Sequence, residues 1–452
     1  DLPPPALAPL HRGPRPGVKA GAAASYETFA RKAKGQALSG AARCKRIGIG
    51  RSPAALRAAG EPELWRWHSD TLQSSVGDEP QEELAPGEAS LLALKRELAE
   101  RLLGPRCRLC FLRCPVDRRA GERGACGLGT GLRPYQDFVH LGEELELIPT
   151  HAVYLAGCNY RCAYCSDWDA VVRPDEISEV APEVLARSIE ARRREGATSL
   201  SLIGGVPDVS LPAILAALEL AEVSAPLVWN TNLSATPEAA DLLAGVVDAY
   251  VADLKYGNEA CAQAGSAVKG SLAVAQGLLT RCASEAYLIV RHLVLPGHVT
   301  CCALPTLEWL ARALPGTRLN LMGHYLPPEQ VKGSSWDRLP RADELGAARA
   351  RAAELGFDLD GPGLLGDITP RLRPGGAPVE SAAGFSSEIR IEPGGRVVIE
   401  NLSPELLGIL ESLGGELPEL ELRRLAGGAW RTSPEDGGEP PADPVAAGFT
   451  PA

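Results

Sequence analysis

The sequence of 452 residues has no apolar stretch long enough to cross a membrane. A spanning helix needs about 18 or more predominantly apolar residues, and even the apolar segment 211–223 is interrupted by Glu219. The first 25 residues are rich in Pro, Ala and Gly and hold no apolar core of the kind found in secretory signals. We therefore expect a cytoplasmic protein without a membrane span.

Excess positive charge is also missing, since 46 Lys and Arg stand against 57 Asp and Glu, for a net charge of −11. A protein that neutralises many phosphates usually carries a basic face or domain, so this balance argues against a nucleic-acid partner. The single methionine, Met322, excludes a Met-rich peptide groove. A hydrophobic fraction of 45% with 23% charged residues is ordinary for a soluble globular protein.

The 12 cysteines are too sparse for a disulfide scaffold, and seven of them fall within 107–165. Cysteines at short spacing, in a chain without a secretory signal, indicate metal or redox chemistry in a reducing compartment. The other five show no ligand spacing, and we expect them to be buried or idle thiols: Cys44, Cys261, Cys282, Cys301 and Cys302.

Regular alternation of β-rich and helical segments begins near residue 151. The expected strands are 152–155, 200–203, 227–229, 250–253, 287–293 and 319–322, and the expected helices are 182–195, 211–223, 237–244, 271–280, 304–313 and 343–355. Strands alternating with helices of this length predict βαβ units and a parallel sheet. Six units fall short of the eight in a closed barrel, so we expect an α/β fold shaped as an open, partial barrel, with its site at the C-terminal ends of the strands.

The rest of the chain divides around this barrel. We expect a flexible lead-in (1–50), a helical segment with a Cys-rich knuckle (51–150), the barrel (151–360), a linker (361–384), a small hairpin–helix α+β unit (385–430) and a disordered tail (431–452). In the small unit, Pro393-Gly394-Gly395 between two β-rich runs predicts a hairpin. Ser403-Pro404 then predicts the start of a helix over 405–413.

The strongest motif directly follows the first expected strand, where Cys158, Cys162 and Cys165 stand at x3 and x2 spacing. A cubane 4Fe–4S cluster normally takes four cysteines. Three leave one iron open to an outside ligand, as a catalytic zinc keeps a vacant position. The alternative is a structural zinc with a fourth ligand from elsewhere in the chain.

These three cysteines match the signature of radical S-adenosylmethionine (SAM) enzymes, whose fold is a partial (β/α)6 barrel. Over 107–357 the chain resembles the pyruvate formate-lyase-activating-enzyme-like subfamily of that group. The resemblance rests on the knuckle 107–127 and on the runs VWNTN (228–232), DLKYG (253–257), RHLVLPGH (291–298) and NLMGHY (320–325).

The resemblance implies a 4Fe–4S cluster on the three cysteines, reductive cleavage of SAM to a 5′-deoxyadenosyl radical, and hydrogen abstraction from a substrate. It also implies a flavodoxin- or ferredoxin-like reductant. The substrate is left open between a glycyl-radical protein, a peptide or protein to be modified, and a small molecule. The residues expected to line the SAM or substrate pocket are Tyr164, Gly204, Gly205, Pro207, Asn230, Asn232, Asp253, Lys255 and His324.

A second group of cysteines precedes the barrel at x2, x3 and x11 spacing: Cys107, Cys110, Cys114 and Cys126. Four thiolates without a vacancy suit a structural zinc or an auxiliary iron–sulfur cluster. The neighbouring arginines are expected to offset the negative charge of the thiolates, with an anion or nucleic-acid patch as the alternative. If the radical chemistry fails altogether, the rival hypothesis is a non-catalytic zinc or metal-binding scaffold or adaptor.

Overall fold

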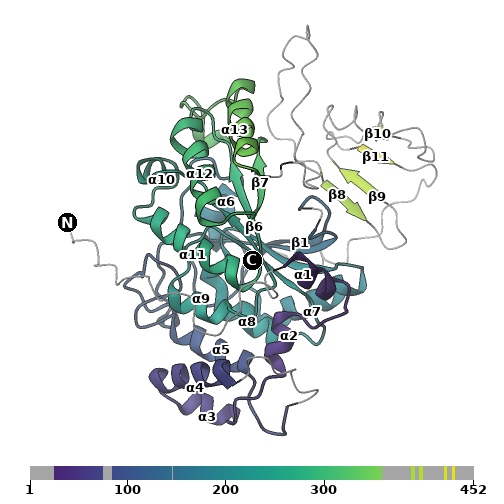
Figure 1. The fold of residues 1–452 in the computed structure, drawn as a ribbon. Helices are drawn as coiled ribbons and strands as arrows, with labels where there is room; N and C mark the ends of the chain where they lie inside the picture. The colour runs from purple at the N-terminus through teal and green to yellow at the C-terminus, as the bar shows by residue number, and fades with distance from the viewer. Residues whose placement is uncertain are drawn as a thin grey trace. The chain divides into compact units, whose positions relative to one another are not determined.

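The computed structural model describes residues 25–74, 84–144, 146–357 and 359, and the backbone of four short strands further along the chain (Figure 1). The chain separates into two compact units, Asp1–Thr369 and Pro370–Ala452. None of the described helices combines the length and apolar character that a membrane crossing requires.

A seven-stranded sheet forms the centre of the first unit, and its strands lie side by side in chain order. They are β1 (Pro134–His140), β2 (Thr150–Leu155), β3 (Ser199–Gly204), β4 (Leu227–Thr231), β5 (Ala249–Asp253), β6 (Tyr287–Leu293) and β7 (Arg318–Met322). Strands β2 to β7 are parallel, and β1 pairs antiparallel with β2. The expected α/β fold and its six parallel strands are confirmed.

Helices follow the parallel strands and cover the outside of the sheet (Figure 1). They are α6 (Trp168–Val172), α7 (Pro182–Arg194), α8 (Leu211–Leu220), α9 (Pro237–Leu243), α10 (Glu259–Ser266), α11 (Ser271–Glu285), α12 (Leu304–Ala313) and α13 (Ala342–Glu354). Helix α8 is apolar nearly all round and is largely buried, as expected of a helix covered on more than one side. The main core includes the fully buried Trp229 of β4.

The described residues before the sheet form helices, two of which lie within the lead-in expected over 1–50, whose residues 1–24 are outside the described part of the chain. Helices α1 (Tyr26–Ala33), α2 (Gly40–Lys45), α3 (Pro53–Ala58), α4 (Glu61–Ser74) and α5 (Leu91–Arg101) precede β1. The Lys32 Nζ atom lies 2.6 Å from the buried Asp248 carboxylate, which also accepts from the Gly40 N–H. The expectation of flexibility is therefore corrected for 26–45, because contacts to a residue distant in sequence hold helices α1 and α2 in place.

Strand β1 was not expected, because its sequence mixes polar and aromatic residues without an apolar alternation. Its Asp137 carboxylate accepts hydrogen bonds from Ser188 (2.5 Å) and Arg192 (3.0 Å) of α7 and lies 3.0 Å from His151 Nε2 of β2. Side-chain pairing to two neighbouring elements thus fixes this antiparallel edge strand.

In the second unit, β8 (Glu388–Ile391) pairs antiparallel with β9 (Val397–Glu400), which confirms the expected hairpin. Strands β10 (Leu422–Arg424) and β11 (Trp430–Thr432) form a second antiparallel pair. The expected linker 361–384, the helix over 405–413 and residues 433–452 of the expected tail lie outside the described residues.

Candidate functional site

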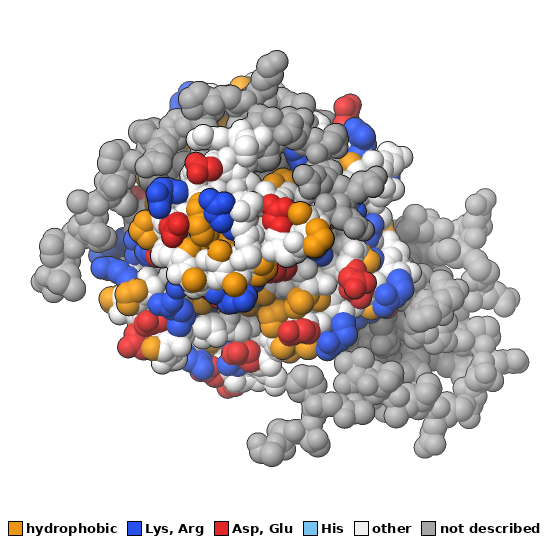
Figure 2. Space-filling view, turned by 90° about the horizontal axis from the view of Figure 1, so that it is seen from below, with side chains coloured by type: hydrophobic (Ala, Val, Ile, Leu, Met, Phe, Trp, Pro, Cys, Tyr) orange, Lys and Arg blue, Asp and Glu red, His pale blue; other side chains and the backbone are white. Residues whose placement is uncertain are grey.

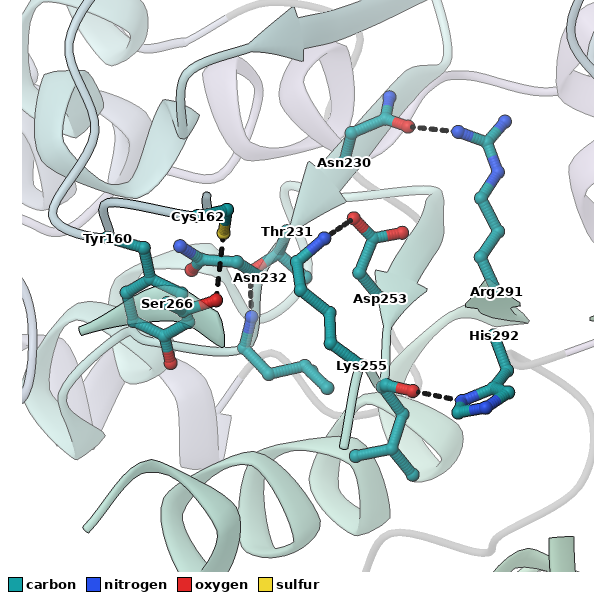
Figure 3. Close-up of polar contacts among 12 residues, drawn as sticks. Tyr160, Cys162, Asn230, Thr231, Asn232, Asp253, Lys255, Ser266, Arg291 and His292 are labelled. Carbon is teal, nitrogen blue, oxygen red and sulfur yellow. Dashed lines mark hydrogen bonds and ion pairs between the residues drawn. The ribbon is translucent and has the colours of Figure 1, made fainter. Parts of the chain in front are cut away.

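The loop after β2 carries Cys158, Cys162 and Cys165, at the end of the sheet where the parallel strands terminate. It begins at Gly157, whose φ of +80° is a left-handed conformation that favours glycine. Cys158 is buried, and the other two thiols are half-buried. The Cys162 Sγ atom lies 2.9 Å from Ser266 Oγ at the end of α10 (Figure 3).

Burial raises the pKa of all three thiols, and that of Cys165 rises to about 12. The thiols are therefore protonated without metal, and metal binding must release their protons. Within the described residues, these sulfurs are not drawn together within 4.8 Å. Three thiolates on one loop suit a cubane cluster, in which each binds a different iron and the fourth iron keeps an open position. The donor set thus fits a 4Fe–4S cluster with one open iron.

The turn at Gly204 and Gly205 holds the start of this loop. A Cβ atom on Gly205 would lie 1.9 Å from the Gly157 carbonyl oxygen, so glycine is required there for packing. The Gly205 N–H donates to Leu155 O (2.7 Å) and the Val206 N–H donates to Gly157 O (3.2 Å). Pro207 then begins the short helical turn η3 (Pro207–Ser210) and is buried.

Polar side chains from the ends of β4 and β5 lie beside the cysteine loop (Figure 3). The Asn232 Nδ2 atom donates to Asn159 Oδ1 at 3.0 Å and approaches Cys158 Sγ at 3.7 Å. Its Oδ1 atom is buried without a hydrogen-bond partner, as is the Nδ2 atom of Asn230. Buried amide atoms of this kind cost free energy unless a ligand pairs with them.

Asp253 ends β5, and its carboxylate accepts from Lys255 Nζ at 2.6 Å. Burial alone lowers the pKa of Lys255, but Asp253 and Cys162 together outweigh burial and raise this pKa well above its usual range. Lys255 therefore stays a cation at this rim, and it also favours ionisation of the nearby Cys162 thiol. The ion pair offers one donor and one acceptor to a zwitterionic ligand.

Tyr164 packs among aromatic rings, whereas His324 lies at the surface. The Tyr164 hydroxyl donates to Tyr256 Oη at 2.8 Å, and its ring centroid lies 5.4 Å from that of Trp336 and 6.2 Å from that of Tyr325. It thus belongs to an aromatic wall beside the cysteine loop. His324 lies two residues beyond β7 and is exposed.

A buried charge network inside the sheet was missed in the sequence. The Arg291 guanidinium of β6 donates to Glu144 at 2.7 and 2.6 Å and also to Glu143. Asn320 Nδ2 donates to Glu144 Oε1 at 2.9 Å. Burial alone raises the pKa of Glu144, but Arg291 outweighs burial and lowers it. Arg291 and Asn320 fall within recognised motifs, whereas no pattern marks the two glutamates.

Two hydrogen bonds connect Cys114 to other parts of the cysteine knuckle. The Cys107 N–H donates to Cys114 O (3.1 Å), and the Ala125 N–H donates to Cys114 Sγ (3.5 Å). Among the described residues, the four sulfurs of Cys107, Cys110, Cys114 and Cys126 are not gathered within 4.8 Å.

Two arginines of the knuckle pair with carboxylates, whereas Arg118 donates to the carbonyl oxygens of Gly129 (2.9 Å) and Val209 (2.8 Å). Arg108 binds Glu61 at 2.8 Å, and Arg113 binds Glu238 at 2.8 Å. On the face seen in Figure 2, basic and acidic side chains alternate without a continuous basic area.

The remaining cysteines and histidines divide into core residues and a third cysteine group. Cys44 and Cys282 are buried, as expected. His292 is also buried, with Nδ1 2.6 Å from Leu254 O, in line with a core position. Cys302 is buried as well. The lack of ligand spacing did not predict that the fold brings three sulfurs and His298 within 4.8 Å of one another: Cys261, Cys301 and Cys302.

Comparison with known proteins finds a family match over the region that contains the cysteine loop. Residues 153–310 match the model of the Radical SAM superfamily. The uncharacterized protein MJ0674 of Methanocaldococcus jannaschii is 32% identical over 279 residues, covering 60% of this chain and 80% of that protein. SuiB of Streptococcus suis matches at 13% identity and a TM-score of 0.33 over 45% of this chain and 44% of SuiB. A structure of SuiB bound to S-adenosylmethionine matches at 13% identity and a TM-score of 0.34, over 44% of each chain.

Proposed function

Because the chain belongs to the radical SAM superfamily, we propose that Cys158, Cys162 and Cys165 hold the 4Fe–4S cluster at which it cleaves SAM. When bound, the reduced cluster and SAM supply an electron and a 5′-deoxyadenosyl radical, which abstracts a hydrogen atom from the substrate. The observation that carries the proposal is the placement of three thiols directly after β2, beside the polar ends of β4 and β5 (Figure 3).

The residues at this rim have the chemistry to hold the amino-acid part of SAM. The Lys255 ammonium pairs with a carboxylate, and the Asp253 carboxylate pairs with an ammonium group. The unpaired Asn232 Oδ1 and Asn230 Nδ2 atoms supply one further acceptor and one further donor. We assign the backbone of Gly204, Gly205 and Pro207 to the same pocket, and His324 to its outer edge.

The aromatic wall restricts access of water to the reacting atoms. The Tyr164 hydroxyl donates to Tyr256, whose hydroxyl lies 2.6 Å from Ser266 Oγ, and Ser266 in turn contacts Cys162. This chain of contacts fixes the Tyr164 ring between the cysteine loop and α10. A fixed, apolar wall protects a reactive intermediate from side reactions with solvent.

For the substrate, we propose a protein or peptide, either a glycyl-radical protein to be activated or a peptide to be modified, which are two of the three classes that the subfamily resemblance leaves open. The half-buried Arg291 and the buried Glu143 and Glu144 would give the interior of the sheet polar contacts for a backbone or side chain. A flavodoxin- or ferredoxin-like protein would supply the electron. The knuckle would hold zinc or an auxiliary cluster.

The deciding experiment measures 5′-deoxyadenosine released from SAM by the anaerobically reconstituted, dithionite-reduced protein. A Cys158/Cys162/Cys165→Ala variant should release none, whereas Cys282→Ala, a buried thiol remote from the loop in the sequence, should match the parent. Product formation that survives the triple substitution contradicts the assignment. Zinc in place of iron, with no binding of SAM, supports the rival scaffold instead.

A further inference from the structure

Four potential metal ligands meet outside the site described above. Cys261 lies on α10, whereas His298 precedes the π-helical turn η4 (Val299–Ala303) that contains Cys301 and Cys302. Their four donor atoms all lie within 4.8 Å of one another. Cys302 is buried and the other three are half-buried, so an ion can reach the group from solvent.

The distances match those around one tetrahedral ion. Zn–S bonds of about 2.3 Å and Zn–N bonds of about 2.0 Å place two sulfurs roughly 3.8 Å apart and a sulfur and a nitrogen roughly 3.5 Å apart. The Cys261 and Cys301 sulfurs are 3.6 Å apart, and His298 Nδ1 lies 3.4 Å from Cys301 Sγ and 3.8 Å from Cys302 Sγ. A disulfide would bring two sulfurs to about 2.05 Å, so these are free thiols.

We propose that Cys261, His298, Cys301 and Cys302 form a binding site for zinc or another thiophilic divalent cation. Thiolate and imidazole donors select such ions over magnesium or calcium. When zinc binds, three thiols lose their protons and the occupied site carries a net charge of −1. The proposal stands independently of the proposed function, because it uses none of the cysteines of the β2 loop.

The fold arranges these ligands before any ion arrives. In η4 the N–H groups of Cys302 and Ala303 both point to His298 O, at 2.8 and 3.1 Å. This widened turn places His298 and the two cysteines on one side of the chain, and such turns are frequent at functional sites. Asn258 connects the second segment, because its Nδ2 atom donates to Cys301 O (2.8 Å) and lies 3.2 Å from Cys261 Sγ.

The contact between Trp336 and His298 makes ion binding observable. The Trp336 indole N–H donates to His298 Nε2 at 2.9 Å, which leaves the proton of the neutral ring on Nδ1. A cation on Nδ1 requires this proton to move to Nε2, and two N–H groups then face each other. Trp336 must therefore release His298 when the ion binds, and its indole competes with the ion.

The first test compares zinc and iron contents of the reconstituted full-length protein by elemental analysis. Cys261→Ser and Cys301→Ser should each lose about one zinc per chain and keep their iron, whereas Cys44→Ser and Cys282→Ser, which alter buried cysteines outside the group, should lose neither. Unchanged zinc in the first pair overturns the proposal. Loss of iron in that pair also overturns it, because the thiols would then belong to an iron–sulfur cluster.

The second test keeps all four ligands and so does not depend on whether a cysteine variant folds. Trp336→Phe removes the competing donor, and zinc affinity, measured by competition with a chromogenic chelator, should rise by about three- to tenfold. In the parent, saturating zinc should change the part of the tryptophan fluorescence that Trp336→Phe lacks. Unchanged or weaker affinity, or a fluorescence indifferent to zinc, contradicts binding through His298.

Discussion

Two cysteine groups lie beside the aromatic wall: the cysteines of the β2 loop, and the group of Cys261, Cys301 and Cys302. They differ in how far apart their members lie in the sequence. Cys158, Cys162 and Cys165 belong to one loop, and their spacing alone identifies them. Cys261 and Cys301 are 40 positions apart, yet their sulfurs lie 3.6 Å from each other. Spacing reveals a site only when one segment carries its ligands, whereas parallel β/α units bring remote loops together at one end of the sheet. A lack of spacing is therefore weak grounds for calling a cysteine idle.

The largest expected effect is a difference in iron content between variants of the two cysteine groups. Cys162→Ala removes one of three cluster ligands, so iron content and the visible absorption of the cluster should fall by more than half, and 5′-deoxyadenosine formation should fall by about a hundredfold or more. Cys301→Ala should leave the iron content unchanged, because its sulfur belongs to the other group. Iron analysis and absorption spectra of both reconstituted variants check this pair.

If Cys301→Ala also lost its cluster, the comparison would fail and the two groups would act as one centre. The contact chain from Cys162 through Ser266 makes this outcome physically accessible, since Ser266 and Cys261 share α10. Cys261→Ser should therefore be analysed beside it. Retained iron in both variants shows that α10 carries two separable functions.

The second prediction concerns the ion pairs that Arg291 forms with Glu143 and Glu144, two residues remote from it in the sequence. Arg291→Met leaves the Glu143 and Glu144 carboxylates buried without their cation, and breaking a buried pair in this way costs about 3–5 kcal/mol. Urea unfolding at pH 7 should show this loss. Arg173→Met, which removes an exposed partner of Asp169, should cause no measurable change. Equal losses in both variants would contradict a special role for the interior network.

Much of the fold could be predicted because its signals are local. Strands β2 to β5 are short runs that are largely buried, and all six parallel strands appear within a few residues of their expected bounds. Helix α12 (Leu304–Ala313) has the expected bounds, with Pro305 in its first turn. The loop of Cys158 was equally visible, because its ligands and the strand before it are contiguous.

Several of the features that were missed depend on contacts between remote segments. Helices α1 and α2 are held by Asp248, whose partners Lys32 and Gly40 lie more than 200 positions away. Glu144 is recognisable only beside Arg291, which is 147 positions further along. No window of sequence contains both members of such a pair, and propensity alone cannot supply the contact.

The third prediction tests how an unexpected element is held in place. Burial alone raises the pKa of Asp137, but His151, Ser188 and Arg192 together lower it to about 2. Because the folded pKa lies below the unfolded one, the stabilisation is complete above about pH 4 and is lost as the pH falls toward 2. Asp137→Asn should therefore lower the free energy of unfolding by about 2 kcal/mol at pH 7.

Urea unfolding of parent and variant between pH 7 and pH 2.5 provides the check. The difference between the two proteins should shrink as the pH falls below about 4, since the parent carboxylate becomes protonated. A difference that is constant with pH would show that Asp137 contributes by shape and neutral hydrogen bonds alone. Strand β1 would then owe its place to backbone pairing with β2.

The smallest effect concerns Asn258, which joins the two segments of the third cysteine group. Its Oδ1 atom caps α10 by accepting from the Cys261 N–H (2.9 Å), and its Nδ2 atom donates to Cys301 O (2.8 Å). Asn258→Ala removes both contacts and should cost about 1 kcal/mol of stability through the lost cap. Asn258→Asp keeps the capping oxygen and should leave the helix intact.

Both variants lose the donor to Cys301 O, so zinc affinity should fall several-fold in each, and further in Asn258→Asp because a carboxylate faces the thiolates. Chelator competition and urea unfolding measure the two effects separately. If Asn258→Asp binds zinc as tightly as the parent, the cap alone positions Cys261 and the link between the segments is dispensable. If zinc affinity instead falls without loss of stability, the site depends on the hydrogen bond from Asn258 to Cys301 O, which connects its two segments.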